Sequence, residues 1–258
     1  MSVNVEALAD EVHAAATAPA REGARFERRP YGEIITNPSY PAVFFLHAIY
    51  ELEAPDWDAA RLERVIDEAM PYATEYRAYS RDPATRAGLG PRLVAAGYEA
   101  RHDALMAQLF EPPTAAELPF RIEQVTDARS WRDFESLVRT DWAKFEARAV
   151  DQLLGFYRWS VDNAPRRFYI AYEGDRGIAH AGLHQHGFTG YFHALFTLPE
   201  ARRRGAGSML TVRLAEEAHA AGCDRVVLHC DRDSHLPAYY ERLGFRTVGE
   251  ETVWSRPR

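Results

Sequence analysis

The chain of 258 residues lacks the features that mark membrane-spanning and secreted proteins. No apolar run approaches the roughly 20 residues that span a bilayer. The first residues show no basic segment followed by an apolar stretch, so no secretory signal is visible. There are two cysteines, Cys223 and Cys230, and we expect buried thiols rather than a disulfide. These absences predict a cytoplasmic protein with no membrane partner.

A broad basic surface is missing as well. Residues 1–115 hold 11 Arg against 18 Asp plus Glu, and residues 116–258 hold 20 Lys plus Arg against 20 Asp plus Glu. Neither half has the excess of positive charge with which proteins bind phosphate backbones. We therefore expect no nucleic-acid partner. The hydrophobic content of 47% is ample for packed cores.

A proline-rich segment divides the chain. Pro112, Pro113 and Pro119 lie within ten residues and continue neither a helix nor a central strand. We predict an accessory domain over residues 1–111, a linker over 112–119 and a second domain over 120–258.

Strand and helix signals alternate in the second domain, which predicts an α/β fold with a mixed sheet. Ser130 is the expected N-cap of its first helix. The expected strands cover residues 120–125, 167–172, 178–186, 190–198, 225–230 and 245–254, and the expected helices cover 130–147, 150–161, 208–221 and 237–243.

The first half carries weaker signals: a strand over 43–50 and a helix over 58–70. Its end parallels the end of the second half. In both, a short helix is followed by a Gly, an aromatic residue and a strand, at Leu93–Tyr98 and at Tyr240–Phe245. This parallel indicates an internal duplication. Leu93 stands where Tyr240 stands in the second half.

One turn has no counterpart in the first half. It follows the expected strand ending at Leu195, Phe196 and Thr197, and it consists of Arg202, Arg203, Arg204, Gly205, Ala206, Gly207 and Ser208. Glycines let backbone N–H groups approach an anion, a helix N-terminus attracts negative charge, and arginines add charge-assisted hydrogen bonds. The turn therefore suits a phosphate-bearing ligand. A dinucleotide fingerprint is disfavoured by Leu210, and the Gly-Lys-Ser/Thr of a P-loop is absent.

Residues 120–256 resemble the GNAT superfamily of acetyl-CoA-dependent N-acetyltransferases. The signature of that superfamily is Arg or Gln, two variable residues, then Gly-x-Gly or Gly-x-Ala, matched here by Arg202–Gly207. Pro199 stands three residues before it, as is common in the family. The second matching element is Tyr-Glu-x-x-Gly-Phe at Tyr240–Phe245. The resemblance implies a GNAT-like fold here and a smaller, degenerate GNAT-like lobe in the first half.

The same resemblance implies the roles of particular residues. Backbone groups of Leu195, Phe196 and Thr197 hold the pantetheine arm, and the turn Arg203–Ser208 holds the pyrophosphate. Tyr240 protonates the thiolate leaving group. The amine attacks the thioester directly, without a covalent acyl-enzyme, although Cys230 lies close in sequence.

The general base is poorly marked. His229 is our candidate because its pKa range suits the task, with His193 and Asp231 as rivals. His180, His184 and His186 share strand parity and favour a polar face over a metal site. Asp141, Trp142 and Glu146 fit either an ordinary helix surface or a pocket for a cationic amine.

The predicted protein is thus an acetyl-CoA-dependent N-acetyltransferase acting on an amine of a small molecule or a peptide. It holds no metal, and a homodimer is compatible with it. Two alternatives stay open: a non-catalytic acyl-CoA sensor, and an acyltransferase that uses a longer acyl or an aminoacyl donor.

Overall fold

The computed structural model describes residues 4–109 and 119–258, and its strands form one mixed sheet of eleven. The predicted linker at 112–119 lies, except for Pro119, outside the described residues. Hydrogen-bonded neighbours follow the order β1-β2-β3-β4-β11-β5-β10-β9-β8-β7-β6. The strands are β1 (Arg25–Arg29), β2 (Gly32–Thr36), β3 (His47–Tyr50), β4 (Glu75–Ser80), β5 (Glu99–Gln108), β6 (Arg121–Gln124), β7 (Arg166–Glu173), β8 (Arg176–His186), β9 (Thr189–Thr197), β10 (Arg225–Asp231) and β11 (Phe245–Pro257).

The helices confirm most of the expected positions. They are α1 (Val5–Arg21), α2 (Ala59–Ala69), α3 (Pro83–Ala95), α4 (Ala128–Asp141), α5 (Ala147–Asn163), α6 (Ala206–Ala220) and α7 (Leu236–Glu241), with 3-10 turns η1 (Phe44–Leu46) and η2 (Pro199–Ala201). Three local expectations are wrong. The helix expected over 130–147 ends at Asp141, and residues 142–146 form a non-helical connection to α5. The N-cap of α4 is Asp127, with Ser130 as the third helical residue of a capping box. The expected strand over 43–50 is a strand only from His47, because turn bonds coil the residues before it.

By compactness the described chain groups into two units. Unit 1 holds Met1–Ala18, Leu105–Cys230 and His235–Gly249; unit 2 holds Pro19–Ala104, Asp231–Ser234 and Glu250–Arg258. Strands β5 and β11 contribute residues to both. The grouping differs from the division predicted from the prolines, and those domain boundaries stay a prediction.

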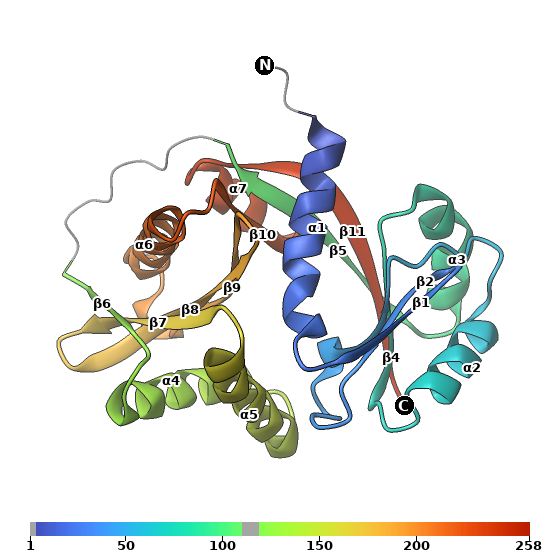
Figure 1. Ribbon diagram of the computed structural model, residues 1–258, viewed down its shortest axis with the longest axis horizontal. Helices are drawn as coiled ribbons and strands as arrows, with labels where there is room; N and C mark the ends of the chain where they lie inside the picture. The colour runs from blue at the N-terminus through green and yellow to red at the C-terminus, as the bar shows by residue number, and fades with distance from the viewer. Residues whose placement is uncertain (1–3, 110–118) are drawn as a thin grey trace. The chain divides into compact units, whose positions relative to one another are not determined.

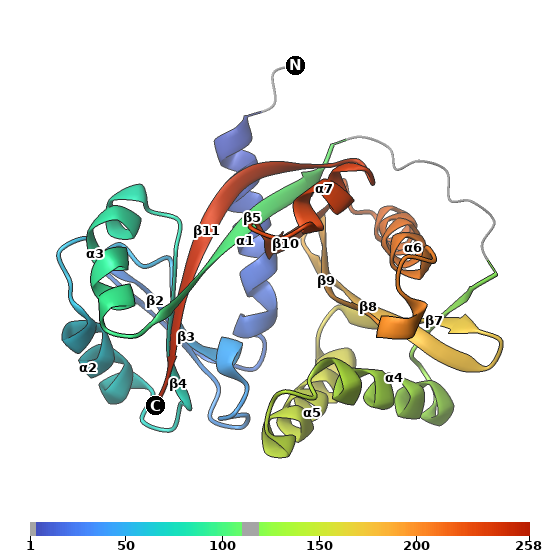
Figure 2. The same ribbon diagram turned by 180° about the vertical axis from the view of Figure 1, so that it is seen from behind.

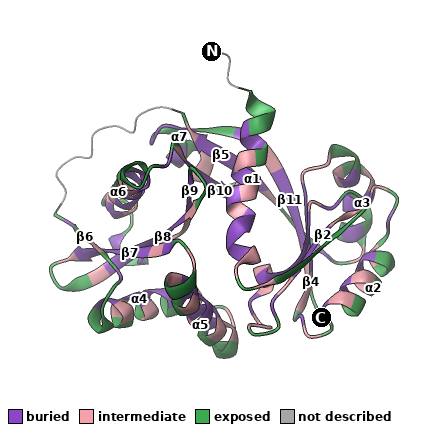
Figure 3. Ribbon diagram, viewed as in Figure 1, coloured by how far each residue is buried: buried purple, intermediate pink, exposed green. Residues whose placement is uncertain are grey.

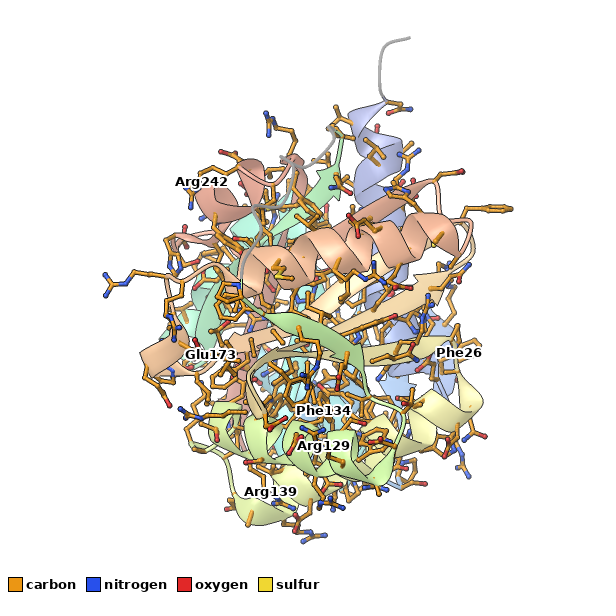
Figure 4. All side chains as sticks on the ribbon, turned by 90° about the vertical axis from the view of Figure 1, so that its left-hand side faces the viewer. Phe26, Arg129, Phe134, Arg139, Glu173 and Arg242 are labelled. Carbon is orange, nitrogen blue, oxygen red and sulfur yellow. The ribbon has the colours of Figure 1, made fainter. Side chains whose placement is uncertain are left out.

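Unit 1 has helices on both faces of its strands. Figures 1 and 2 show α6 on one face of β7, β8 and β9, and α4 and α5 on the other. Phe134 of α4 points into the layer between helix and strands, where its ring lies 4.6 Å from that of Phe168 (Figure 4). The first part of α1 packs Leu8 and Val12 into a cluster with Val227. The strands are accordingly the most buried part of the unit (Figure 3).

Unit 2 is a smaller strand-and-helix unit with its own core. The helix α2 joins β3 to β4, which pair in parallel through Ile49 and Ala78. Leu62 and Ile66 of α2 are fully buried against that core, as the helical spacing predicts. The parallel seen in the sequence also holds in the backbone: Gly97 and Gly244, with φ of +86° and +90°, end α3 and α7 before β5 and β11.

Candidate functional site

The basic turn joins the end of β9 to the start of α6. Gly205 is the N-cap of α6, with φ of +94°, and it supplies no capping side chain. Arg203 also has a positive φ, of +61°. The N–H of Met209 is bonded to the carbonyl of Gly205, so the N–H groups of the three residues before it precede the intrahelical ladder. Successive N–H groups in such a turn form a concave anion-binding site.

Gly207 leaves this helix start without a side chain at a position that has little room for one. A Cβ at this position would lie 3.2 Å from the hydroxyl of Tyr239, and 3.6 Å from side-chain atoms of Leu195 and Thr197. The Tyr239 hydroxyl also lies 3.3 Å from the Oγ of Ser208. Sequence reasoning missed Tyr239, although its place next to Tyr240 was the available signal. The residues present therefore fit a phosphate group at this helix start.

The three arginines of the turn have different surroundings. Arg204 forms an ion pair with Glu173, with Nη1 3.1 Å from Oε2. The Nε of Arg202 donates to the carbonyl of Thr197 at 3.1 Å and fastens the turn to the end of β9. Arg203 is exposed, and within the described parts of the chain it forms no ion pair. Arg203 is thus the arginine most available to an incoming anion.

Beside the turn, the surface carries a hollow of about 680 Å³ next to α4. Its charged lining is mostly acidic: Asp133, Glu173 and Asp175 against Arg176. Three of these charged residues are ion-paired with arginines outside the lining: Glu173 with Arg204, and Asp133 and Asp175 with Arg129.

The end of β9 separates from β10. Pairing of the two parallel strands runs from Thr189 to Tyr191 of β9 and stops there, although both strands continue. On its other side, β9 pairs with β8 with a register shift next to Ala194, whose φ is +53°. The segment from Leu195 to Thr197 therefore has backbone groups directed toward β10 that no β10 residue pairs with.

Tyr240 lies on α7 with its side chain buried against three aromatic rings, those of Phe192, Tyr239 and Phe245. Burial raises the pKa of Tyr240, so the phenol keeps its proton throughout the neutral range. Cys230 is buried nearby, and its thiol donates to the sulfur of Met106 at 3.7 Å. Both cysteines are free buried thiols, as expected.

The candidate base His229 lies on β10 with its ring exposed. Its Nδ1 is 3.0 Å from the hydroxyl of Tyr191, whose ring stacks on that of His193. His193 is a poorer base because burial lowers its pKa well below the usual range. The other rival, Asp231, accepts the backbone N–H of Asp233 at 3.0 Å, in a turn.

The histidines of β8 do not form one uniform polar face. His180 and His184 are buried and His186 is exposed. Burial lowers the pKa of His180 and of His184 to about 3, so both are neutral. Among the residues the structure describes, no three His, Cys, Asp or Glu side chains gather in a way that would hold a metal ion.

A carboxylate faces His180, and sequence reasoning did not bring the two together. The Oδ2 of Asp141, the last residue of α4, lies 4.0 Å from the Nε2 of His180. Burial raises the pKa of Asp141 to about 6. Trp142 follows as the C-cap of α4, and Glu146 is the exposed N-cap of α5.

Comparison with known proteins bears on this geometry. The model of the acetyltransferase (GNAT) family matches residues 131–245, a range that contains the turn, the separated strands and α7. No curated protein sequence matches the chain. None of the helices in the described ranges combines the length and the apolar character that crossing a membrane demands.

Solved structures share the fold at low sequence identity. A functionally unknown conserved protein from Staphylococcus epidermidis ATCC 12228 matches with a TM-score of 0.73 at 11% identity, over 91% of this chain and 94% of that one. A GCN5-related N-acetyltransferase from Kribbella flavida matches with a TM-score of 0.62 at 16% identity, over 97% of this chain and 96% of that one. A tandem GNAT protein from the clavulanic acid biosynthesis pathway matches with a TM-score of 0.52 at 15% identity, over 77% of this chain and 68% of that one. Identities this low carry the fold and nothing more.

Proposed function

We propose that the chain is an acetyl-CoA-dependent N-acetyltransferase, on the premise that residues 131–245 match the model of the acetyltransferase (GNAT) family. It transfers the acetyl group by direct attack of an amine carried by a small molecule or a peptide. The observation that supports this best is the separation of β9 from β10 at the point where β9 leads into an uncapped helix start.

The donor site is formed by the end of β9 and the turn. The backbone of Leu195, Phe196 and Thr197 bonds the pantetheine arm, because no β10 residue pairs with β9 there, although the carbonyl of Thr197 already accepts from Arg202. The pyrophosphate lies on the first N–H groups of α6, over Gly205 to Ser208, where the helix dipole favours negative charge. Arg203 adds a charge-assisted bond, while Arg202 and Arg204 hold the turn in place.

Two residues transfer protons in the proposed reaction. His229 accepts the proton that the nitrogen loses when it attacks the thioester carbon. Tyr240 gives its proton to the sulfur as the carbon–sulfur bond breaks, and solvent restores it. The raised pKa of Tyr240 supports this role, because an acid must begin the step protonated. The buried Cys230, bonded to Met106, supports direct transfer rather than an acyl-enzyme.

The test compares Tyr240→Phe with the parent protein. We expect turnover on a panel of amines to fall about 100-fold, the size of effect typical of a general acid, while acetyl-CoA raises the thermal midpoint of both proteins equally. Tyr76→Phe, which removes an exposed hydroxyl bonded to Asp67 in unit 2, is the matched control.

Two results would redirect the assignment. A parent protein that binds acetyl-CoA and acetylates no amine favours a non-catalytic acyl-CoA sensor. A larger thermal shift with longer acyl-CoA thioesters than with acetyl-CoA favours a different donor. A homodimer stays a prediction, which light scattering of the purified protein checks.

A further inference from the structure

His180 is a buried polar side chain whose ring nitrogens make no hydrogen bond of ordinary geometry. It lies in the middle of β8 and is 1% exposed, and its ring contacts those of Phe134 and Phe196. Within the described residues, neither nitrogen meets a partner in hydrogen-bond geometry. Buried polar atoms are nearly always bonded, so a residue left in this state calls for an explanation.

Asp141 supplies half of that explanation. Its Oδ2 and the Nε2 of His180 are 4.0 Å apart, too far for a direct hydrogen bond. A carboxylate and a neutral imidazole at this separation present two acceptors to one donor placed against both. The side chain of Asp141 is 30% exposed, so this donor has a way in from solvent, whereas His180 has none of its own.

The pair lies at the part of β9 that the proposed function assigns to the donor. His180 is opposite Phe196 in the β8–β9 ladder, and the register shift with Ala194 is adjacent. Burial lowers the pKa of His180, and a weak hydrogen bond with the backbone of Ala194 raises it by less. A group held by Asp141 and His180 is therefore next to the irregular segment of β9.

Building on the proposed function, we infer that Asp141 and His180 form the site that binds the protonated acceptor amine, and that Asp141 removes its first proton. The ammonium group donates one N–H to the carboxylate and one to the imidazole. One N–H proton passes to Asp141, which becomes a neutral acid and later releases the proton to solvent. The lone pair left on nitrogen attacks the thioester carbon. The second proton goes to His229, and the sulfur takes one from Tyr240.

This site selects a class of acceptor. An aliphatic primary amine is a cation at neutral pH, so it gains from a carboxylate and needs a base before it can react. An arylamine is neutral at the same pH and needs neither. The chain should therefore use aliphatic amines through Asp141 and arylamines without it.

The charged groups around Asp141 determine its pH response. Lys144 and Arg202 face it and lower its pKa, Trp142 bonds to it, Tyr157 of α5 lies within electrostatic reach, and burial outweighs them. His180 stays neutral because its pKa is about 3. The use of aliphatic amines should thus fall as the pH drops through about 6, where Asp141 is protonated.

The experiment compares Asp141→Asn with the parent and with Asp151→Asn, which removes an exposed carboxylate of α5 that pairs with Arg139. With n-butylamine as acceptor, we expect Asp141→Asn to lower kcat/KM about 100-fold, and with aniline to change it less than about threefold. Asp141→Asn should also raise the unfolding midpoint at neutral pH, because a buried carboxylate no longer has to ionise. Asp151→Asn should leave both kcat/KM with n-butylamine and the unfolding midpoint unchanged.

A second measurement does not depend on turnover. The carboxyl carbon of Asp141 is titrated by NMR in the Tyr240→Phe protein, with and without n-butylammonium. Binding of the cation to the carboxylate should move the titration midpoint to lower pH. No movement, or equal losses with both amines in Asp141→Asn, would overturn the inference. Movement in a parent that acetylates no amine would instead overturn the proposed function and leave the ammonium site standing.

Discussion

Two helices hold the same place in their units and begin in opposite ways. Helix α2 connects the parallel strands β3 and β4 of unit 2, and α6 connects the parallel strands β9 and β10 of unit 1. The N-cap of α2 is Asp58, in an extended conformation, and its carboxylate accepts the N–H of Arg61 at 2.8 Å. The N-cap of α6 is Gly205, left-handed and without a side chain. One helix start is satisfied by its own chain, and the other is available to a ligand.

The residues before each helix sharpen the contrast. Glu51, Glu53 and Asp56 precede Asp58, whereas Arg202, Arg203 and Arg204 precede Gly205. An anion at the start of α2 would meet an occupied N–H and like charges; at the start of α6 it meets open N–H groups and arginines. The topology is thus shared, and a single turn decides whether it has an anion site.

The largest expected effect is a loss of stability at acidic pH, and it comes from the buried histidines of unit 1. Strands β8 and β9 bury His180, His184 and His193 in a neutral state, because burial lowers the pKa of each. In unit 2, burial lowers the pKa of His47. The unfolded chain takes up these protons below pH 6.5 and the folded chain does not, so stability is lost as the pH falls from that value.

The size of this effect follows from linkage. At about pH 5, His180 and His184 each lower the free energy of unfolding by about 2 kcal/mol, and His193 acts in the same direction. Asp141 acts in the opposite direction. Because its pKa is raised in the folded state, the folded chain binds a proton before the unfolded chain does, and the free energy of unfolding gains about 1.4 kcal/mol between about pH 7 and pH 5. Hydrogen exchange, corrected for intrinsic rates, should therefore show unit 1 losing protection before unit 2 on acidification. Equal loss in both units would contradict this.

The next effect concerns the charge of the two helix starts. Arg203→Glu should weaken acetyl-CoA binding about 100-fold, because a charge-assisted bond of roughly 1.5–3 kcal/mol is replaced by repulsion. Isothermal titration with acetyl-CoA measures it. Arg61→Glu is the matched control: it makes the same reversal in the first turn of α2 and should leave the affinity unchanged. Equal losses in both variants would show that net charge, and not the turn, sets the affinity.

Local patterns predicted local structure well. The strand, turn and helix around Arg202–Ser208 could be read because glycine, arginine and apolar periodicity act over a few residues. Helix α1 was not predicted, because its many alanines give little contrast between its faces. The sequence also did not predict that Leu105–Gln108 group with the later strands in unit 1. Asp141 and His180 are 39 positions apart and meet only because α4 packs on β8. Periodicity within one element cannot report such a contact.

The smallest effect tests the self-capped helix. Asp58→Ala removes the bond to the Arg61 N–H and should cost about 1 kcal/mol, or about 2–4 °C in the midpoint of a chain of this size. It also leaves the start of α2 as uncapped as that of α6. If an open helix start were enough for an anion site, this variant would acquire phosphate affinity, visible as a higher thermal midpoint in inorganic phosphate. We expect no such gain, because the segment that leads into α2 carries Glu51, Glu53 and Asp56 and no run of arginines. Acetyl-CoA binding should be unaffected, since α6 keeps both the open N–H groups and Arg203.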